Sequence, residues 1–180
     1  MATSVPIGPF PPGTDPEAYD RMRRRLLWKL PMGLYVLGSR SGPRRNLMTI
    51  NWATQVSTRP KHVAVSVEGA AVTHALISEG NCFALSLLSR AQRAEVRKFV
   101  KPAVEDPLAG TLGGVHYHEA TTGAPIPELA IAWLDCEVRH RLEVGSHTLF
   151  VGEVVDAGFA EGAEESDVLR MEDTRMSYGG

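Results

Sequence analysis

Residues 46–57 of this chain read Asn-Leu-Met-Thr-Ile-Asn-Trp-Ala-Thr-Gln-Val-Ser, and this stretch decides which fold the chain can adopt. It is long enough for an extended strand, and its Ile, Trp, Val and Thr residues favour β-structure. Thr49, Asn51 and Gln55 are unusual among the apolar positions of a core strand. Either they meet a polar ligand, or they bond to backbone or water in a half-buried strand. The residues of this stretch alone leave both interpretations open.

On both sides of this stretch, strand-like runs alternate with turn signals. Residues 34–38 precede it across a polar turn at 41–43, which predicts a β-hairpin. Further strands are predicted at 62–67, 83–88, 129–143 and 148–157, with Gly145-Ser146 in the turn between the last two. No internal repeat and no long strand–helix alternation is visible. We therefore expect a mainly β fold, an antiparallel barrel with a few accessory helices.

Three helices are predicted beside these strands. Asp15 followed by Pro16 is a typical helix start, and apolar residues then recur at helical spacing until Pro31. A short helix at 72–78 is expected to close at Gly80. An amphipathic helix is expected at 91–100, followed by a loop at 102–114.

Length and composition predict one globular domain. Of 180 residues, 43% are hydrophobic and 22% are charged, a balance that allows a buried core. Proline-rich residues 1–14 are expected to form an extended arm, and residues 15–180 the single domain. The net charge of −2 lacks the basic character of nucleic-acid binders. No signal peptide, membrane span or disulfide framework is predicted, so a cytoplasmic protein is expected.

The common catalytic signatures are missing from the sequence. It contains no G-x-G-x-x-G between a strand and a helix, no Walker sequence and no G-x-S-x-G elbow. His116 with His118, or Cys136 with His140, could be imagined as zinc ligands, but no tight Cys-x-x-Cys or His-Glu-x-x-His pattern accompanies them. No metal is expected. The arginines between residues 21 and 25 are interpreted as a solvated helix face rather than a phosphate or lipid site.

Several motifs follow one another in a specific order. Residues 46–55 fit N-x-M-T-x-N-W-x-T-Q, residues 60–67 fit P-x-x-V-A-V-S-V, and residues 73–77 fit T-H-x-x-I. A later stretch, residues 147–155, begins with His147 and reads His-Thr-Leu-Phe-Val-Gly-Glu-Val-Val. In these motifs the chain resembles the flavin reductase-like, FMN-binding split-barrel family. The resemblance covers residues 30–157 and implies a split β-barrel of the antiparallel Greek-key type.

The resemblance also implies a function. It predicts a homodimer that binds FMN or FAD near the subunit interface, reduces it with NADH or NADPH, and supplies reduced flavin to a monooxygenase component. His147 is the predicted catalytic residue, placed to stabilise charge near the flavin or the nicotinamide carboxamide. The predicted cofactor-binding residues are Thr49, Asn51, Trp52, Ala53, Thr54, Gln55, Ser66, Val67, Thr73 and His74.

The chain departs from the family pattern at two places. Many members carry Gly-Asp-His where this chain has Gly145-Ser146-His147. Residues 168–180 replace the usual P-L-x-Y-x-x-G run. The missing acidic residue motivates an alternative, a flavin-binding electron carrier or sensor that does not oxidise nicotinamide. A barrel that has lost its flavin is a third hypothesis, against which the intact 46–57 motif argues.

Overall fold

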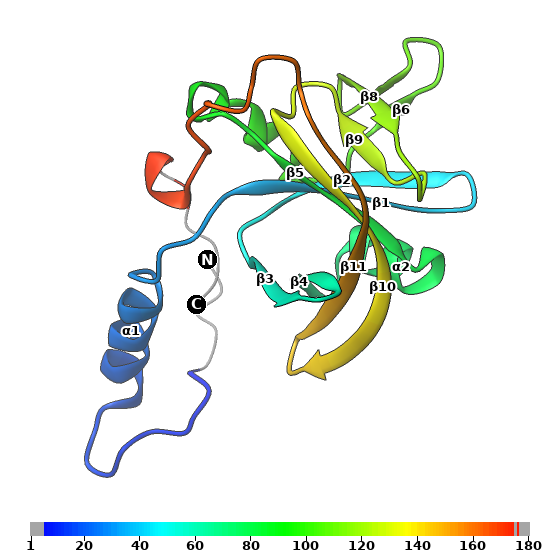
Figure 1. Ribbon diagram of the computed structural model, residues 1–180. Coiled ribbons are helices and arrows are strands. Elements are labelled where there is room, and N and C mark those ends of the chain that lie inside the picture. The colour runs from blue at the N-terminus through cyan, green and yellow to red at the C-terminus, as the bar shows by residue number, and fades with distance from the viewer. Residues whose placement is uncertain (1–5, 175, 177–180) are drawn as a thin grey trace.

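The computed structural model describes residues 6–174 and 176, so the first five residues of the predicted arm and most of the divergent C-terminal end lie outside the described residues. Within these described residues lie two α-helices, eleven strands and three short 3-10 turns (Figure 1). The helical elements are α1 (Pro16–Leu27), α2 (Val72–Gly80), η1 (Arg90–Gln92), η2 (Glu95–Phe99) and η3 (Met171–Asp173). The strands are β1 (Tyr35–Ser41), β2 (Arg44–Ile50), β3 (Ala53–Thr58), β4 (Lys61–Glu68), β5 (Cys82–Leu87), β6 (Glu105–Asp106), β7 (Thr111–Leu112), β8 (Val115–Glu119), β9 (Pro125–Pro127), β10 (Ala132–Val144) and β11 (His147–Phe159).

The main sheet has seven antiparallel strands in the order β2-β1-β5-β10-β11-β4-β3. Its two edge strands, β2 and β3, are neighbours in the chain, because only Asn51 and Trp52 separate them. In a flat sheet these strands would lie about 29 Å apart, six strand spacings. The peptide from Ile50 to Ala53 spans at most about 11 Å. The sheet must therefore curl until its edges meet at this corner.

The curled sheet is not sealed by hydrogen bonds. In the part of the chain that the structure describes, no ladder joins β2 to β3. Register shifts at Asp135/Cys136 and at Val138/His140 interrupt the long β10–β11 hairpin, and bulges of this kind bend a strand and increase its twist. The predicted mainly β, antiparallel fold with accessory helices is confirmed. A smaller sheet, β6-β7-β8-β9, adds to it.

Two apolar cores lie on opposite faces of the central strands. Successive residues of β1, Val36 and Leu37, belong to different cores because side chains alternate along a strand. One core gathers around Phe83 and Phe150, and the other around Phe99. Since β5 is covered on both faces, its sequence is almost continuously apolar, as in a buried strand, whereas β1 is apolar only in its first half.

The predicted single strand over residues 46–57 is wrong in one respect, because it is two strands with a corner between them. The predicted helix at 91–100 is also wrong. It is a pair of short 3-10 turns, η1 and η2, in which Val96 and Phe99 are buried three residues apart. Three residues is one full turn of a 3-10 helix, so both side chains reach the same core. In the predicted loop at 102–114, β6 and β7 form short strands.

Helix α2 continues two residues beyond its predicted end. The left-handed residue that ends it is Asn81, with φ of 56°, and not Gly80. Glycine at position 80 has a different cause, since a Cβ there would lie 1.8 Å from the backbone oxygen of Arg40. The helix packs against β1 at this point, and only glycine allows so close an approach.

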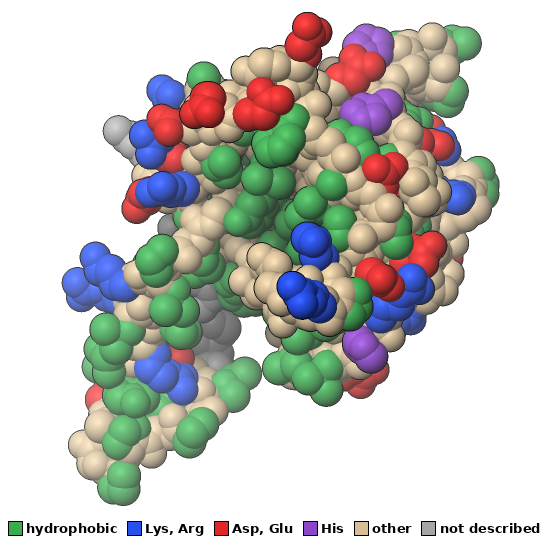
Figure 2. Space-filling model, viewed as in Figure 1, with side chains coloured by type: hydrophobic (Ala, Val, Ile, Leu, Met, Phe, Trp, Pro, Cys, Tyr) green, Lys and Arg blue, Asp and Glu red, His purple; other side chains and the backbone are tan. Residues whose placement is uncertain are grey.

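Helix α1 projects from the body of the molecule (Figure 1). It starts as predicted, with the Asp15 carboxylate accepting a hydrogen bond from the Ala18 N–H at 2.7 Å. None of its residues is buried in the single chain, and even the apolar Leu26 and Leu27 are 61% and 52% exposed. Apolar side chains dominate this projecting part in Figure 2. The helix therefore presents an apolar face without cover from its own sheet.

Candidate functional site

The corner between β2 and β3 is held by the strand beside it. The Ser66 N–H of β4 donates to the Trp52 carbonyl at 3.0 Å, and the Ala53 N–H donates to the Asn51 carbonyl at 3.1 Å. These bonds fix the backbone where the two edge strands meet. The Asn51 and Trp52 side chains are consequently held at a cavity wall, with Asn51 6% exposed.

A cavity of about 460 Å³ opens beside this corner. Its walls come from β2, the corner, β4, the start of α2 and the β10–β11 turn. The lining residues are Met48, Thr49, Ile50, Asn51, Trp52, Ser66, Glu68, Ala71, Ser146 and His147. Aromatic and aliphatic walls with a few polar groups are typical of a small-molecule site.

His147 is the first residue of β11 and is oriented by two neighbours. Its Nδ1 lies 2.9 Å from the Ser146 hydroxyl oxygen. Its ring is 4.9 Å from the Trp52 ring, centroid to centroid, with the planes tilted by 54°. Across the β11–β4 ladder its register partner is Glu68, so these two side chains share a face of the sheet.

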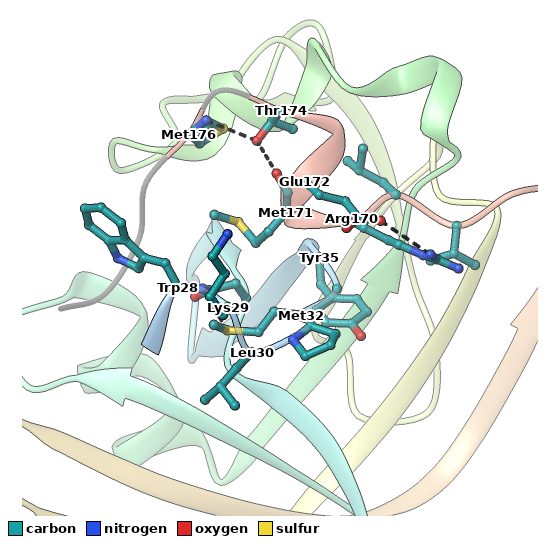
Figure 3. A pocket seen from close by; sticks show the side chains of 15 residues that line it. Trp28, Lys29, Leu30, Met32, Tyr35, Arg170, Met171, Glu172, Thr174 and Met176 are labelled. Atoms are coloured by element: carbon teal, nitrogen blue, oxygen red, sulfur yellow. Dashed lines mark hydrogen bonds and ion pairs between the residues drawn. The ribbon is translucent and has the colours of Figure 1, made fainter. Parts of the chain in front are cut away.

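Two larger cavities of about 750 and 770 Å³ adjoin the corner on the side of the α1–β1 linker. Asn51 lines all three cavities. Its Nδ2 donates to the Met32 sulfur at 3.4 Å, a weak bond because a thioether is a poor acceptor. Burial raises the pKa of the neighbouring Tyr35 hydroxyl, which stays protonated as a donor. In Figure 3, Met32 and Met171 point into the cavity of about 770 Å³ while Arg170 extends away from it.

Of the predicted site residues, seven line these cavities. Thr49, Asn51, Trp52, Ser66 and His147 meet around the smallest one. Ala53 and Thr54 line the cavity of about 750 Å³ together with Asn51, Trp52 and Ser66.

The other four predicted residues lie away from the three cavities. The Gln55 amide donates to the Ser57 carbonyl at 3.1 Å, and Val67 is buried in a core. Thr73 is buried and its hydroxyl oxygen accepts from Asn46 at 2.8 Å. The Nε2 of His74 lies 2.8 Å from the Thr148 hydroxyl oxygen. Thr49 also has a protein partner, the Val96 carbonyl, to which its hydroxyl donates at 2.5 Å.

Comparison with known families and structures decides the assignment. Residues 26–178 match the family model described as "Flavin reductase like domain". This chain belongs to the flavin reductase-like family. The expected enzyme class, a flavin reductase, is confirmed at this level.

Relatives and solved structures agree with the family. An "NADH-dependent FAD reductase" from Streptomyces globisporus is 32% identical over 154 residues, which cover 82% of this chain and 81% of the relative. The solved "Streptomyces globisporus C-1027 NADH:FAD oxidoreductase SgcE6" is 29% identical with a TM-score of 0.71, over 91% of this chain and 89% of that one. The styrene monooxygenase flavin reductase (SMOB) from Pseudomonas putida S12 is 29% identical with a TM-score of 0.66, over 77% and 86%. The chain spans about a quarter of the length of the Nostoc and Synechocystis diflavin flavoproteins that it also matches.

The residues at the corner fit the flavin that this family name implies. An isoalloxazine ring needs an apolar slot with a few donors and acceptors at its polar edge. Trp52 and Ile50 supply apolar wall, while Asn51, Ser66 and His147 supply polar atoms. The Oδ1 of Asn51 has no hydrogen-bond partner within residues 6–174 and 176, so it is available to a ligand. In the same described part, no group of three potential metal ligands gathers, and no helix is long and apolar enough to cross a membrane.

Sequence reasoning missed the site residues that come from the α1–β1 linker and the start of β1, and those at the end of β4 and before α2. Met32 and Tyr35 line the larger cavities, and Glu68 and Ala71 line the smaller one. Glu68 could have been found, because it ends the 60–67 motif strand directly opposite His147. No sequence pattern pointed to Met32, since its place beside Asn51 depends on the path of the linker between α1 and β1.

Proposed function

We propose that this protein binds FMN or FAD at the β2–β3 corner and reduces it with NADH or NADPH. The observation that carries the proposal is the cavity in which Asn51, Trp52 and His147 converge. The family membership and the names of the flavin reductases similar to this chain support it. When bound, the flavin would supply the hydride chemistry at its N5, which no side chain can provide.

The chain's own residues would bind, orient and shield the reactants. Trp52 would form one apolar wall, and the Asn51 amide and Ser66 hydroxyl would bond to polar edges of the ligand. His147, half-buried beside Trp52, would place a ring nitrogen against developing negative charge. Ala53 and Thr54 would extend the wall on the side of the larger cavity.

The predicted residues outside the cavities would act through the strands that carry the site. Thr73 bonds to Asn46 of β2, and His74 bonds to Thr148, the residue after His147. Gln55 would steady β3 and Val67 would anchor β4, which bears Ser66. We propose that these four side chains hold the cofactor site in shape.

Homodimerisation is part of the proposal and rests on α1. A monomeric protein gains nothing from a projecting helix with exposed leucines, whereas a second copy could cover that face. Wild-type protein should have twice the monomer mass by light scattering at micromolar concentration. Leu26→Glu should shift the mass toward the monomer, while Glu17→Gln on the same helix should not. A wild-type monomer that still binds flavin would contradict the dimer proposal.

Two further elements of the proposal concern its setting. A monooxygenase component is the proposed consumer of reduced flavin, because SMOB, whose name links it to styrene monooxygenase, is similar over most of this chain. A cytoplasmic setting is proposed because Cys82 and Cys136 are free, buried thiols.

Anaerobic mixing tests the reaction directly. Flavin-loaded protein is mixed with NADH or with NADPH while the absorbance of oxidised flavin is followed. Bleaching with at least one nucleotide is expected. Tight flavin binding without bleaching would favour the electron carrier or sensor. If neither FMN nor FAD changes its fluorescence on titration or raises the melting temperature, the proposed function fails.

A further inference from the structure

The ring of His147 is held at one nitrogen only. Its Nδ1 lies 2.9 Å from the Ser146 hydroxyl oxygen, and within residues 6–174 and 176 nothing hydrogen-bonds to its Nε2. Both residues line the 460 Å³ cavity. The Nε2 atom is therefore the ring nitrogen left to meet a ligand.

The Ser146 hydroxyl is fixed from the backbone side. The Ser146 carbonyl accepts a hydrogen bond from the Gly69 N–H at 2.9 Å, which ties the β10–β11 turn to the end of β4. Gly145 takes the positive φ of 58° that this turn needs. Ser146 is consequently held beside the ring, although its side chain faces solvent.

A partner at Nδ1 decides what Nε2 can do. A neutral imidazole has one N–H and one lone pair, so a donor at Nδ1 places the ring proton on Nε2. A hydroxyl can donate or accept, whereas a carboxylate at position 146 could only accept. The carboxylate of Glu68, the register partner of His147, lines the same cavity. Its negative charge favours the tautomer whose proton faces the cavity.

We propose that Ser146 is a positioning residue that donates its hydroxyl proton to Nδ1 of His147, so that Nε2–H faces the cavity as a hydrogen-bond donor. The ligand group that fits such a donor is a carbonyl oxygen or a nitrogen that gains negative charge. This inference rests on the proposed flavin-reducing function. A carboxylate at position 146 could only accept from Nδ1–H, which would leave Nε2 as an acceptor instead of a donor.

The tautomer can be read by NMR without any turnover. Long-range proton–nitrogen correlations of the His147 ring, assigned by their loss in His147→Ala, are recorded where the ring is neutral. Wild type should show a protonated Nε2 and a lone pair on Nδ1. Ser146→Thr, which keeps the hydroxyl, should look the same, Ser146→Ala should show mixed tautomers, and Ser146→Asp should show a protonated Nδ1. A protonated Nδ1 in wild type, or no change in Ser146→Ala, overturns the proposal.

A kinetic measurement separates positioning from folding. Ser146→Ala should slow single-turnover flavin reduction about three- to tenfold, the effect of weakening one hydrogen bond, with flavin affinity and melting temperature unchanged. Ser146→Thr should restore the rate. An unchanged rate in Ser146→Ala counts against the proposal. If wild type reduces no flavin, the proposed function fails while the tautomer still tests the Ser146 contact.

Discussion

Two asparagines from the same motif should fail in different ways when each is replaced by alanine. Asn46 is 4% exposed, its Nδ2 donates to the Thr73 hydroxyl at 2.8 Å, and its Oδ1 accepts from the Ala103 N–H at 2.7 Å. Asn51 is as well buried, but among the described residues its amide bonds to the Met32 sulfur alone, and it lines the cavities. Asn46 should therefore matter for the fold, and Asn51 for the ligand.

The size of each effect follows from the partners that are lost. Asn46→Ala removes two hydrogen bonds and leaves the Ala103 N–H unpaired, at a cost of about 2–4 kcal/mol in unfolding free energy. For a domain of this size that lowers the melting temperature by roughly 5–15 °C. Asn51→Ala gives up a weak sulfur contact, which costs less than about 1 kcal/mol. Loss of one ligand hydrogen bond should weaken flavin binding about tenfold.

Urea unfolding and flavin fluorescence titration, run on both variants and on wild type, measure these two quantities separately. Each variant serves as the control for the other, since both remove the same side chain from the same motif. The reasoning would be refuted if Asn46→Ala kept its full stability, or if Asn51→Ala lost several kcal/mol while flavin affinity stayed at the wild-type value.

Three other predictions follow from contacts described above. His147→Ala should slow hydride transfer about ten- to a hundredfold in single-turnover measurements, whereas His116→Ala, which changes an exposed histidine of β8, should keep the wild-type rate; a near wild-type rate in folded, flavin-loaded His147→Ala would remove the catalytic role. Thr49→Val should lower the unfolding free energy in urea by about 1–3 kcal/mol, because the Val96 carbonyl loses the Thr49 hydroxyl as a donor. A variant that keeps its stability but binds flavin more weakly would contradict this prediction. Burial raises the pKa of Asp135, so the folded state holds the carboxyl proton of this residue more tightly than the unfolded state does. The stability of wild type relative to Asp135→Asn should therefore fall as pH rises through the raised pKa. A difference in stability that does not change with pH would refute this prediction.

The strands were predictable where local pattern and turn chemistry agree. The β10–β11 hairpin was expected from two long β-like runs around Gly145-Ser146, and the structure has it, with β10 beginning three residues later than predicted and β11 longer at both ends. The corner at Asn51-Trp52 could not be predicted, because it arises where the β1–β2 hairpin and the β3–β4 hairpin join opposite edges of the sheet, and those places are set by β5, β10 and β11, which follow later in the chain. Local alternation within residues 46–57 carries no information on these distant pairings.

The site was harder to predict, because a buried polar side chain looks the same in sequence whether it binds a ligand or the protein. Thr49 and Asn51 stand two residues apart in one motif, yet the Thr49 hydroxyl donates to the Val96 carbonyl and the Asn51 amide lines all three cavities. Only the three-dimensional arrangement shows that η2 brings its carbonyl to Thr49. Trp52 and His147 were singled out by the motifs, and their contact across the cavity could not be read from strands almost a hundred residues apart.

The covalent corner between the two edges of the sheet has a mechanical consequence. β2 and β3 are joined by a peptide and by no ladder in the described part of the chain, so they can move apart beyond the corner without breaking an interstrand bond. A sealed barrel would have to rupture several such bonds to widen by the same amount. The open boundary between β2 and β3 is thus where the sheet deforms most easily. Backbone amides that face this boundary should exchange with deuterium much faster than those of β5 and β10 at the centre of the sheet.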